Sequence, residues 1–169
     1  MKLTVITGTC GAGKSTVRDI LSQLLDGSRF ACFDTDGLGL NWWDYAGTDH
    51  EQDYSSDCLK RAVQLAGGRD IVFASCLNPL DYFRSTDLPQ EIEATVFAAL
   101  CPSDEAIWER LRARPAERGF TSDEKILPHA EYNKWFRKNR GKFALFIDNT
   151  DQPPEQTAEL LAEFILSHT

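Results

Sequence analysis

The sequence predicts an α/β protein of three layers, in which a five-stranded parallel sheet lies between two layers of helices. Five short segments rich in apolar and β-branched residues alternate with segments that have the apolar spacing of a helix. A glycine-rich stretch joins the first of these strands to the first helix. Alternating strands and helices build a parallel sheet covered on both faces, with ligands bound at the carboxyl ends of its strands.

The expected strands are short and mostly apolar. Segment 71–75 is apolar nearly throughout, which is typical of a strand buried on both faces of a parallel sheet. Segment 3–7 has the same character and runs directly into the glycine-rich stretch. In chain order, the five expected strands are 3–7, 30–33, 71–75, 94–100 and 143–147.

The expected helices follow from apolar spacing and from capping residues. Segment 16–25 places its apolar residues on one helical face. Gly67 and Gly68 end the second helix, and Ser103 is a suitable N-cap for the third. Pro128 is expected to kink or split the fourth helix. The expected helices are 16–25, 55–66, 104–114, 123–138 and 154–166, with a short further segment at 79–84.

Size and charge restrict the classes of protein that this chain can represent. Its 169 residues suit a single domain, 1–169, with a sizeable core. The net charge of −8 disfavours duplex nucleic acid as a partner, because such binding relies on clustered lysines and arginines. No apolar run is long enough to span a membrane or to serve as a signal peptide. We expect a monomer or a homodimer.

The five cysteines indicate a reducing compartment. Cys10, Cys32, Cys58, Cys76 and Cys101 are odd in number and widely spaced, without a CxxC pair. We therefore expect reduced, buried thiols and a cytoplasmic protein. Cys10 differs in lying within the glycine-rich stretch, where the end of a helix could lower its pKa. We interpret Cys10 as a small residue that fills a variable position.

The glycine-rich stretch matches the phosphate-loop pattern G-x-x-x-x-G-K-[ST], with the strand before it and the helix after it that the pattern requires. Its glycines allow backbone N–H groups to converge on phosphate oxygens at the positive end of the helix. Lys14 is expected to reach the β- and γ-phosphates of ATP, and the Ser15 hydroxyl to bind Mg²⁺. The expected contacts to the nucleotide are Gly8, Thr9, Cys10, Gly11, Ala12, Gly13, Lys14, Ser15 and Thr16.

Two carboxylates follow the second expected strand. Asp34 and Asp36 are separated by one residue, and residues i and i+2 of an extended strand point to the same side. Both could therefore face the γ-phosphate, one holding Mg²⁺ and the other taking a proton from an attacking hydroxyl. The alternative is that one or both only bracket a turn with Thr35 and Gly37.

The acceptor side of the site is expected in the loops 37–54. Residues 30–59 contain no lysine or arginine but seven acidic residues. A phosphorylated acceptor would require arginines, so this composition favours a neutral or cationic small molecule that carries a hydroxyl group. Trp42, Trp43 and Tyr45 could stack on such a molecule. Equally, the tryptophans could plug the top of the core while the acids face solvent.

A cluster of arginines ends the third helix and enters the polar segment 114–124, which we expect to form a short lid. Arg110 and Arg114 are four residues apart and would share one face of that helix. Transfer of a phosphoryl group requires cations that arrive as the site closes and excludes water, a role that suits Arg114 and Arg118. The alternative is a charged surface helix in which Glu109 and Glu117 are the ionic partners.

Together these segments resemble the small P-loop kinases, a group that includes adenylate-kinase-like, shikimate-kinase-like and gluconate-kinase-like enzymes and chloramphenicol phosphotransferase. The resemblance covers nearly the whole chain, and it implies the P-loop nucleoside triphosphate hydrolase fold of the nucleotide-kinase type. Asp34-Thr35-Asp36 resembles the Asp-x-Asp of shikimate and gluconate kinases. That likeness implies that Asp34 serves the metal and that Asp36 is the base. Segment 72–77 resembles the third strand of gluconate kinases.

Two further segments carry the resemblance to the nucleotide-binding parts of these enzymes. Residues 110–114 resemble the start of the family's lid, which implies that Arg110 packs on adenine and that Arg114 meets phosphates. Residues 147–150 resemble the segment that lines the adenine pocket, which implies contact from Asn149. The chain departs from shikimate kinases in lacking their glycine triplet after the third strand. No aspartate closes that strand as a Walker B residue.

These observations lead to the hypothesis of an ATP- and Mg²⁺-dependent kinase for a hydroxyl group of a small molecule. Lys14, Asp36, Arg114 and Arg118 are the expected catalytic residues, and Ser15 and Asp34 the expected metal ligands. A nucleoside or nucleotide kinase is the first alternative. The second is a regulatory module that binds or hydrolyses nucleoside triphosphate without an acceptor.

Overall fold

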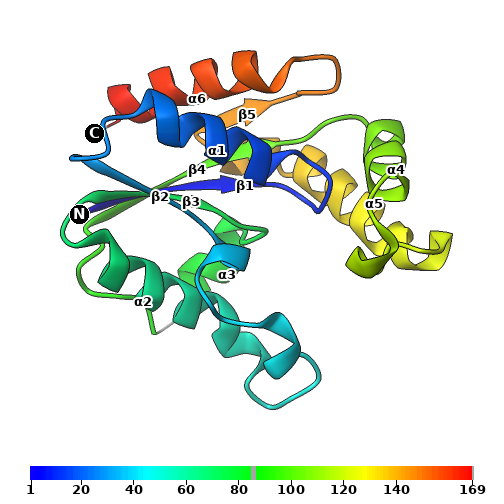
Figure 1. Cartoon of the computed structure of the whole chain (residues 1–169), viewed down its shortest axis with the longest axis horizontal. Coiled ribbons are helices and arrows are strands. Elements are labelled where there is room, and N and C mark those ends of the chain that lie inside the picture. The colour runs from blue at the N-terminus through cyan, green and yellow to red at the C-terminus, as the bar shows by residue number, and fades with distance from the viewer. Residues whose placement is uncertain (85–86, 169) are drawn as a thin grey trace.

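A parallel sheet of five strands lies at the centre of the computed structural model, which describes residues 1–84 and 87–168 (Figure 1). The order of the strands is β2-β3-β1-β4-β5, so the first strand lies in the middle of the sheet. Every pairing is parallel, as expected from the alternation of strands and helices. The strands are β1 (Lys2–Thr7), β2 (Phe30–Asp34), β3 (Asp70–Ala74), β4 (Ala94–Leu100) and β5 (Leu145–Ile147).

Helices cover both faces of this sheet, and the expected three layers are confirmed. In Figure 1, α1 and α6 lie on one face, α2 and α3 lie on the other, and α4 and α5 lie toward the end at which β1 points. None of the described helices is both long and apolar enough to cross a membrane. The helices are α1 (Lys14–Leu24), α2 (Tyr54–Ala66), α3 (Pro79–Arg84), α4 (Asp104–Arg112), α5 (Asp123–Lys138) and α6 (Pro154–Ser167).

Two apolar cores follow from the alternation of side chains along the strands. Leu3 and Val5 of β1 point to the face covered by α2, where they join a cluster that contains Leu59. Ile6 points to the other face and joins a cluster with Leu21 of α1 and residues of α6. Because β1 is the middle strand and is buried on both faces, the segment that follows it leaves from the centre of the sheet.

The structure differs from the expected boundaries at several helix and strand ends. Helix α4 ends at Arg112, two residues early, because Pro115 disfavours a helical conformation of the residue before it. Strand β5 begins at Leu145, since a single 3₁₀ turn at Arg140–Lys142 precedes it. Pro128 neither splits nor ends α5, which continues to Lys138. The proline ring removes the backbone hydrogen bond to the Glu124 oxygen, but the residues on either side remain helical.

The loops 37–54 are also more structured than expected. They contain 3₁₀ turns at Trp42–Asp44 and Glu51–Asp53, and a further turn at Thr35–Gly37 precedes them. Asp34 caps the turn at Thr35–Gly37, and Asn41 caps the turn at Trp42–Asp44. Each side chain accepts a hydrogen bond from the backbone N–H two residues further along the chain. Short polar side chains thus fold this segment locally, without a long helix or strand.

The second core depends on helix α6, and this dependence can be measured. Leu161 is fully buried, whereas its neighbour Leu160 is 40% exposed. We expect Leu161→Ala to lower the free energy of unfolding by about 2–5 kcal/mol, because it leaves a cavity between α6 and the sheet. The matched variant Leu160→Ala should change it by less than about 0.5 kcal/mol. Equal losses in urea denaturation would contradict the packing described for α6.

Candidate functional site

The glycine-rich loop between β1 and α1 adopts a conformation that only its glycines allow. Gly8, Gly11 and Gly13 have φ angles of 148°, 85° and 96°. A Cβ atom on Gly8 would lie 2.4 Å from the backbone oxygen of Leu100 in β4, so a side chain there would collide with the sheet. Gly13 is the left-handed N-cap from which α1 begins at Lys14, two residues earlier than expected. The loop therefore wraps the first turn of a helix whose N–H groups lack partners within the helix.

Two side chains from other segments brace this loop from outside. The Nδ2 group of Asn149, after β5, donates a hydrogen bond to the Ala12 oxygen at 2.8 Å. The Arg110 guanidinium of α4 bonds the Gly11 oxygen at 3.4 Å and the oxygens of Asn149 and Thr150 at 3.0 and 3.2 Å. Both residues singled out for the adenine pocket thus lie beside the loop. Their contacts in this structure are to the backbone.

Lys14 holds its ammonium group over the start of the loop. Its Nζ atom donates to the oxygens of Gly8 and Thr9, each at 2.9 Å, and approaches the Cys76 sulfur at 3.4 Å. Ser15 and Thr16, the next two residues of α1, are exposed. The loop thus presents an ammonium group, a hydroxyl group and the positive end of a helix on one side.

The environment of Cys10 differs from that expected of a simple filler. Its thiol is hydrogen-bonded to that of Cys76, and this bond lowers the pKa of Cys10 to about 6, with help from the charges of Lys14 and Arg114. The same bond raises the pKa of Cys76. The expected lowering at Cys10 therefore arises chiefly from a neighbouring thiol. The expectation of buried thiols is confirmed for Cys58 and Cys101, but Cys10 and Cys32 are partly exposed and Cys76 is exposed.

The two carboxylates after β2 lie close together but do not share the side of a strand. Strand β2 ends at Asp34, and the next residues form a 3₁₀ turn, so the argument from strand geometry is wrong. Asp34 is buried and accepts a hydrogen bond from the Asp36 N–H at 3.1 Å. The turn thus uses Asp34 as its cap, as the structural alternative supposed. The carboxylate of Asp36 remains exposed at the edge of the site.

Arg118 of the segment 114–124 reaches across to this carboxylate. Its Nη1 atom lies 3.3 Å from Oδ2 of Asp36, although 82 residues separate the two in the chain. Both side chains are largely exposed, so the pair is weak and can be exchanged for other partners. The contact brings together two residues that the sequence assigned to catalysis.

The other arginines of this region divide between the site and the surface. Arg114 lies outside α4, so the prediction that it shares a helical face with Arg110 is wrong. Its guanidinium lies 5.4 Å from the centre of the Phe120 ring, and its charge still reaches Cys10. Arg112 points elsewhere and pairs with Asp123 at 2.9 Å. Arg114 therefore lies toward Cys10 of the glycine loop and Arg118 toward Asp36, whereas Arg112 lies away from the site.

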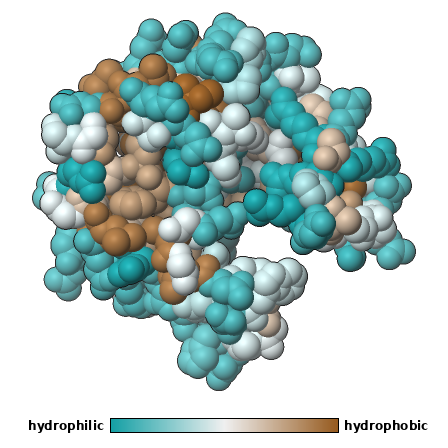
Figure 2. All heavy atoms as spheres, in the orientation of Figure 1, coloured by the Kyte–Doolittle hydropathy of each residue, from teal (hydrophilic) through white to brown (hydrophobic). Residues whose placement is uncertain are grey.

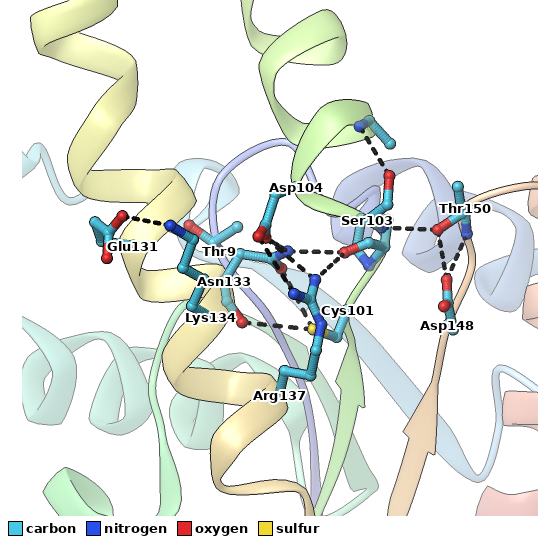
Figure 3. A network of polar contacts seen from close by, with 12 residues as sticks. Thr9, Cys101, Ser103, Asp104, Glu131, Asn133, Lys134, Arg137, Asp148 and Thr150 are labelled. Carbon is cyan, nitrogen blue, oxygen red and sulfur yellow. Dashed lines mark hydrogen bonds and ion pairs between the residues drawn. The ribbon is translucent and has the colours of Figure 1, made fainter.

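A network of polar side chains fastens helix α5 to the same end of the sheet (Figure 3). The fully buried Asn133 donates to the Pro102 oxygen at 2.7 Å and to Oδ1 of Asp104 at 2.9 Å. Arg137, one turn later in α5, binds both oxygens of Asp104, at 3.1 and 3.3 Å. Partial burial acts to raise the pKa of Asp104, but these two donors outweigh it and lower the pKa. Helix α5 is thereby fixed beside the loop.

Helix α5 also touches the site directly, through residues that the sequence did not single out. Thr9 of the loop donates its hydroxyl to the His129 oxygen at 2.9 Å. The Tyr132 hydroxyl donates to the Cys76 oxygen at 3.0 Å and accepts from Asn78 at 2.9 Å. No local motif marks these residues. The one available signal is that Cys76 follows β3. If β3 is assumed to pair with β1, Cys76 lies near the glycine loop that follows β1.

The aromatic residues of the loops 37–54 divide between packing and exposure. The Tyr54 ring contacts those of Trp42 and Tyr45 edge to face, with centroids 5.2 and 5.1 Å apart. The Tyr45 hydroxyl is also bonded to Asp57 at 3.1 Å. Trp43 is 79% exposed and therefore does not plug the core. In Figure 2 the lobe formed by these loops stands apart from the body across an open notch.

The residues of the loop fit a nucleoside triphosphate with Mg²⁺. The cradle admits no side chain at Gly8, and the buried Oδ1 atom of Asn149 has no hydrogen-bond partner among the described residues. Within 1–84 and 87–168, no group of three His, Cys, Asp or Glu side chains could hold a metal by itself. Mg²⁺ in phosphate-transfer sites is commonly bound by one or two carboxylates together with substrate phosphates. Asp34 would supply one such carboxylate, and Ser15 a hydroxyl group.

Comparisons with known proteins agree with this geometry. The sequence model of the AAA domain family matches residues 5–127. No curated protein matches the sequence significantly.

Three solved structures illustrate the likeness in fold. Shikimate kinase from Acinetobacter baumannii is similar with a TM-score of 0.62 and 16% identity, over 100% of this chain and 95% of that one. A gluconokinase from Sinorhizobium meliloti 1021 has a TM-score of 0.63 and 17% identity, over 99% of this chain and 97% of that one. Deoxyadenosine kinase from M. mycoides has a TM-score of 0.60 and 17% identity, over 98% of this chain and 99% of that one. At such identities the likeness establishes the fold.

Proposed function

The chain belongs to the AAA domain family and has the fold of the small P-loop kinases. On this premise we propose that it transfers the γ-phosphoryl group of ATP to a hydroxyl group of a small molecule. The observation that carries the proposal is the contact between Asp36 and Arg118 beside the glycine loop. It joins a carboxylate that can accept a proton to a cation that can face phosphate, at the edge of a phosphate-binding loop.

Each residue of the site has a role in this reaction. The glycine loop and Lys14 bind the phosphates of ATP. Arg110 and Asn149 hold the loop in shape and border the adenine ring. Ser15 and Asp34 are the residues that would hold Mg²⁺, which when bound neutralises charge on the phosphate oxygens. Asp36 accepts the proton of the acceptor hydroxyl as its oxygen attacks the γ-phosphorus and ADP leaves.

Arg114 and Arg118 act on the charge of the transferring group. Cations that surround the phosphoryl group as the segment 114–124 closes stabilise its transition state and exclude water. Because the Asp36–Arg118 pair is exposed and weak, arriving substrates can separate it. Arg118 would then face phosphate while Asp36 faces the acceptor. The segment thus serves as the lid of one domain spanning the chain.

The acceptor is proposed to be neutral or cationic. The loops 37–54 and the start of α2 supply acids and aromatic rings without a lysine or arginine, so they offer little to a phosphate or carboxylate. The exposed Trp43 and the acids beside it suit a sugar-like or amine-bearing molecule. The five free cysteines favour a cytoplasmic reaction.

A screen of ATP consumption against hydroxylated compounds tests the proposed activity. Nucleosides, nucleotides, sugars and aminoglycosides are added singly with ATP and Mg²⁺, and ADP is measured. We expect a neutral or cationic compound to stimulate ADP formation. Lys14→Ala should abolish that stimulation, while Lys138→Ala, which removes an exposed lysine of α5, should retain it. Slow hydrolysis that no compound stimulates would instead indicate a nucleotide-binding module.

Asp36→Asn separates proton transfer from nucleotide binding. We expect kcat for the acceptor to fall by about 10²–10⁴-fold, because the amide cannot accept the proton, while the Kd for ATP changes little. Glu159→Gln, at an exposed acid of α6, is the matched control and should retain full activity. A loss of ATP affinity with kcat unchanged would remove Asp36 from the role of base.

Arg118→Ala tests the role of the lid. Its kcat should fall by roughly 10²-fold or more, the usual effect of removing a group that stabilises transition-state charge. Arg112→Ala, a nearby arginine paired with Asp123, should keep kcat close to the wild-type value. If the two variants behave alike under saturating substrates, Arg118 has no part in transfer.

A further inference from the structure

The two thiols at the glycine loop form a pair that the proposed kinase reaction does not use. Cys10 lies in the loop, three residues beyond the end of β1, and Cys76 lies two residues beyond the end of β3. Strands β1 and β3 are neighbours, with Ile6 opposite Ala74. Adjacent strands lie about 4.8 Å apart, so their ends bring the two cysteines together. Their thiols are hydrogen-bonded to each other.

The backbone around Cys76 is held in place, so the contact between the thiols is built into the fold. The Ser75 N–H donates to the Ile6 oxygen at 3.0 Å, which continues the pairing of β3 with β1. The Cys76 oxygen accepts from the Tyr132 hydroxyl at 3.0 Å, and Asn78 donates to that hydroxyl at 2.9 Å. Helix α5 thus fixes the segment after β3 beside the loop.

The surroundings of the pair favour thiol chemistry at Cys10. Lys14 places its ammonium 3.4 Å from the Cys76 sulfur, and the charges of Lys14 and Arg114 both act on Cys10. The hydrogen bond between the thiols favours a Cys10 thiolate that accepts from the Cys76 S–H group, with the pKa of Cys10 near 6. A thiolate that is partly exposed and lies next to a second thiol is the arrangement in which oxidation yields a disulfide.

We propose that Cys10 and Cys76 are a site of reversible oxidation, at which peroxide forms a disulfide that ties the glycine loop to the end of β3 and so prevents nucleotide binding. The Cys10 thiolate attacks hydrogen peroxide, forming an S–O bond, breaking the O–O bond and releasing hydroxide, which takes up a proton to give water. The Cys76 sulfur then attacks the Cys10 sulfur, forming the S–S bond. The S–O bond of the Cys10 sulfenic acid breaks at the same time, and its hydroxyl group leaves with the proton of the Cys76 thiol as a second water. The two thiols lose two electrons to peroxide, and a dithiol reductant returns them.

The disulfide acts on the nucleotide site through the loop and Lys14. The loop must keep its N–H groups converged on phosphate, and a covalent link at Cys10 fixes the middle of the loop to another segment. The link also changes the sulfur that Lys14 contacts. Because such coupling is reciprocal, bound nucleotide should slow formation of the disulfide. This coupling rests on the proposed function, whereas formation of the disulfide does not.

Peptide mapping of the full chain tests the disulfide directly. Reduced protein is freed of reductant, treated with hydrogen peroxide, alkylated under denaturing conditions and digested without reduction. We expect a Cys10–Cys76 linked peptide that dithiothreitol removes, with Cys32, Cys58 and Cys101 alkylated. Cys32→Ser should form the link like the wild type. Cys76→Ser should leave Cys10 as a sulfenic acid that dimedone traps. Absence of the link while other thiols react, or linkage through another cysteine, would overturn the proposal.

Binding of a fluorescent ATP analogue tests the effect on the site. We expect oxidation to weaken binding by about 10-fold or more, within the range for coupled sites, and dithiothreitol to restore it. In Cys76→Ser, where Cys10 can form only a sulfenic acid and no disulfide, peroxide should weaken binding less than in the wild type. If the disulfide forms and affinity is unchanged, the inhibitory role is wrong. If the reduced protein does not bind the analogue, the proposed function fails, and the peptide map still decides whether the disulfide forms.

Discussion

The close approach of Gly8 to the Leu100 carbonyl is the constraint on which the rest of the site depends. With a Cβ at 2.4 Å from that oxygen, no other residue could leave β1 along this path. The loop then turns through Gly11 and Gly13, both with positive φ, into the first turn of α1. Because β1 is the central strand and is buried on both faces, this path is fixed relative to every other strand end. The positive end of α1 is thereby exposed at one defined place.

Contacts from distant parts of the chain converge on that place. Arg110 and Asn149 hold the loop from the β4 and β5 side of the sheet, while Cys76 meets it from the β3 side. Arg118 then spans from the segment after α4 to Asp36 after β2. Arg110 and Asn149 bond backbone oxygens, whereas the exposed pair of Arg118 and Asp36 is weak and open to exchange. Such an arrangement suits a loop that receives phosphate and a lid that closes over it.

Much of this could be predicted from local sequence, because periodicity and capping are local. The alternation of segments predicted the parallel sheet, and the spacing of Gly8, Gly13 and Lys14 predicted the loop. Errors arose where a turn replaced regular structure. The cap at Asp34 bends the chain before Asp36, and Pro115 ends α4 before Arg114, so two arguments from helix and strand geometry failed. The contacts of Cys76 and Tyr132 depend on which strands are neighbours, and no local pattern contains that information.

The structure also divides features that composition alone had grouped together. In the loops 37–54, Trp42 and Tyr45 pack against Tyr54, whereas Trp43 faces solvent.

Triphosphate binding by the glycine loop through Lys14 is the proposal that every assigned role requires. A crystal structure with Mg²⁺ and a non-hydrolysable ATP analogue tests this proposal. We expect phosphates within the loop and the Lys14 ammonium moved from the Gly8 and Thr9 oxygens onto them. An empty loop, or Lys14 still bound to those carbonyls beside a nucleotide held elsewhere, would contradict it.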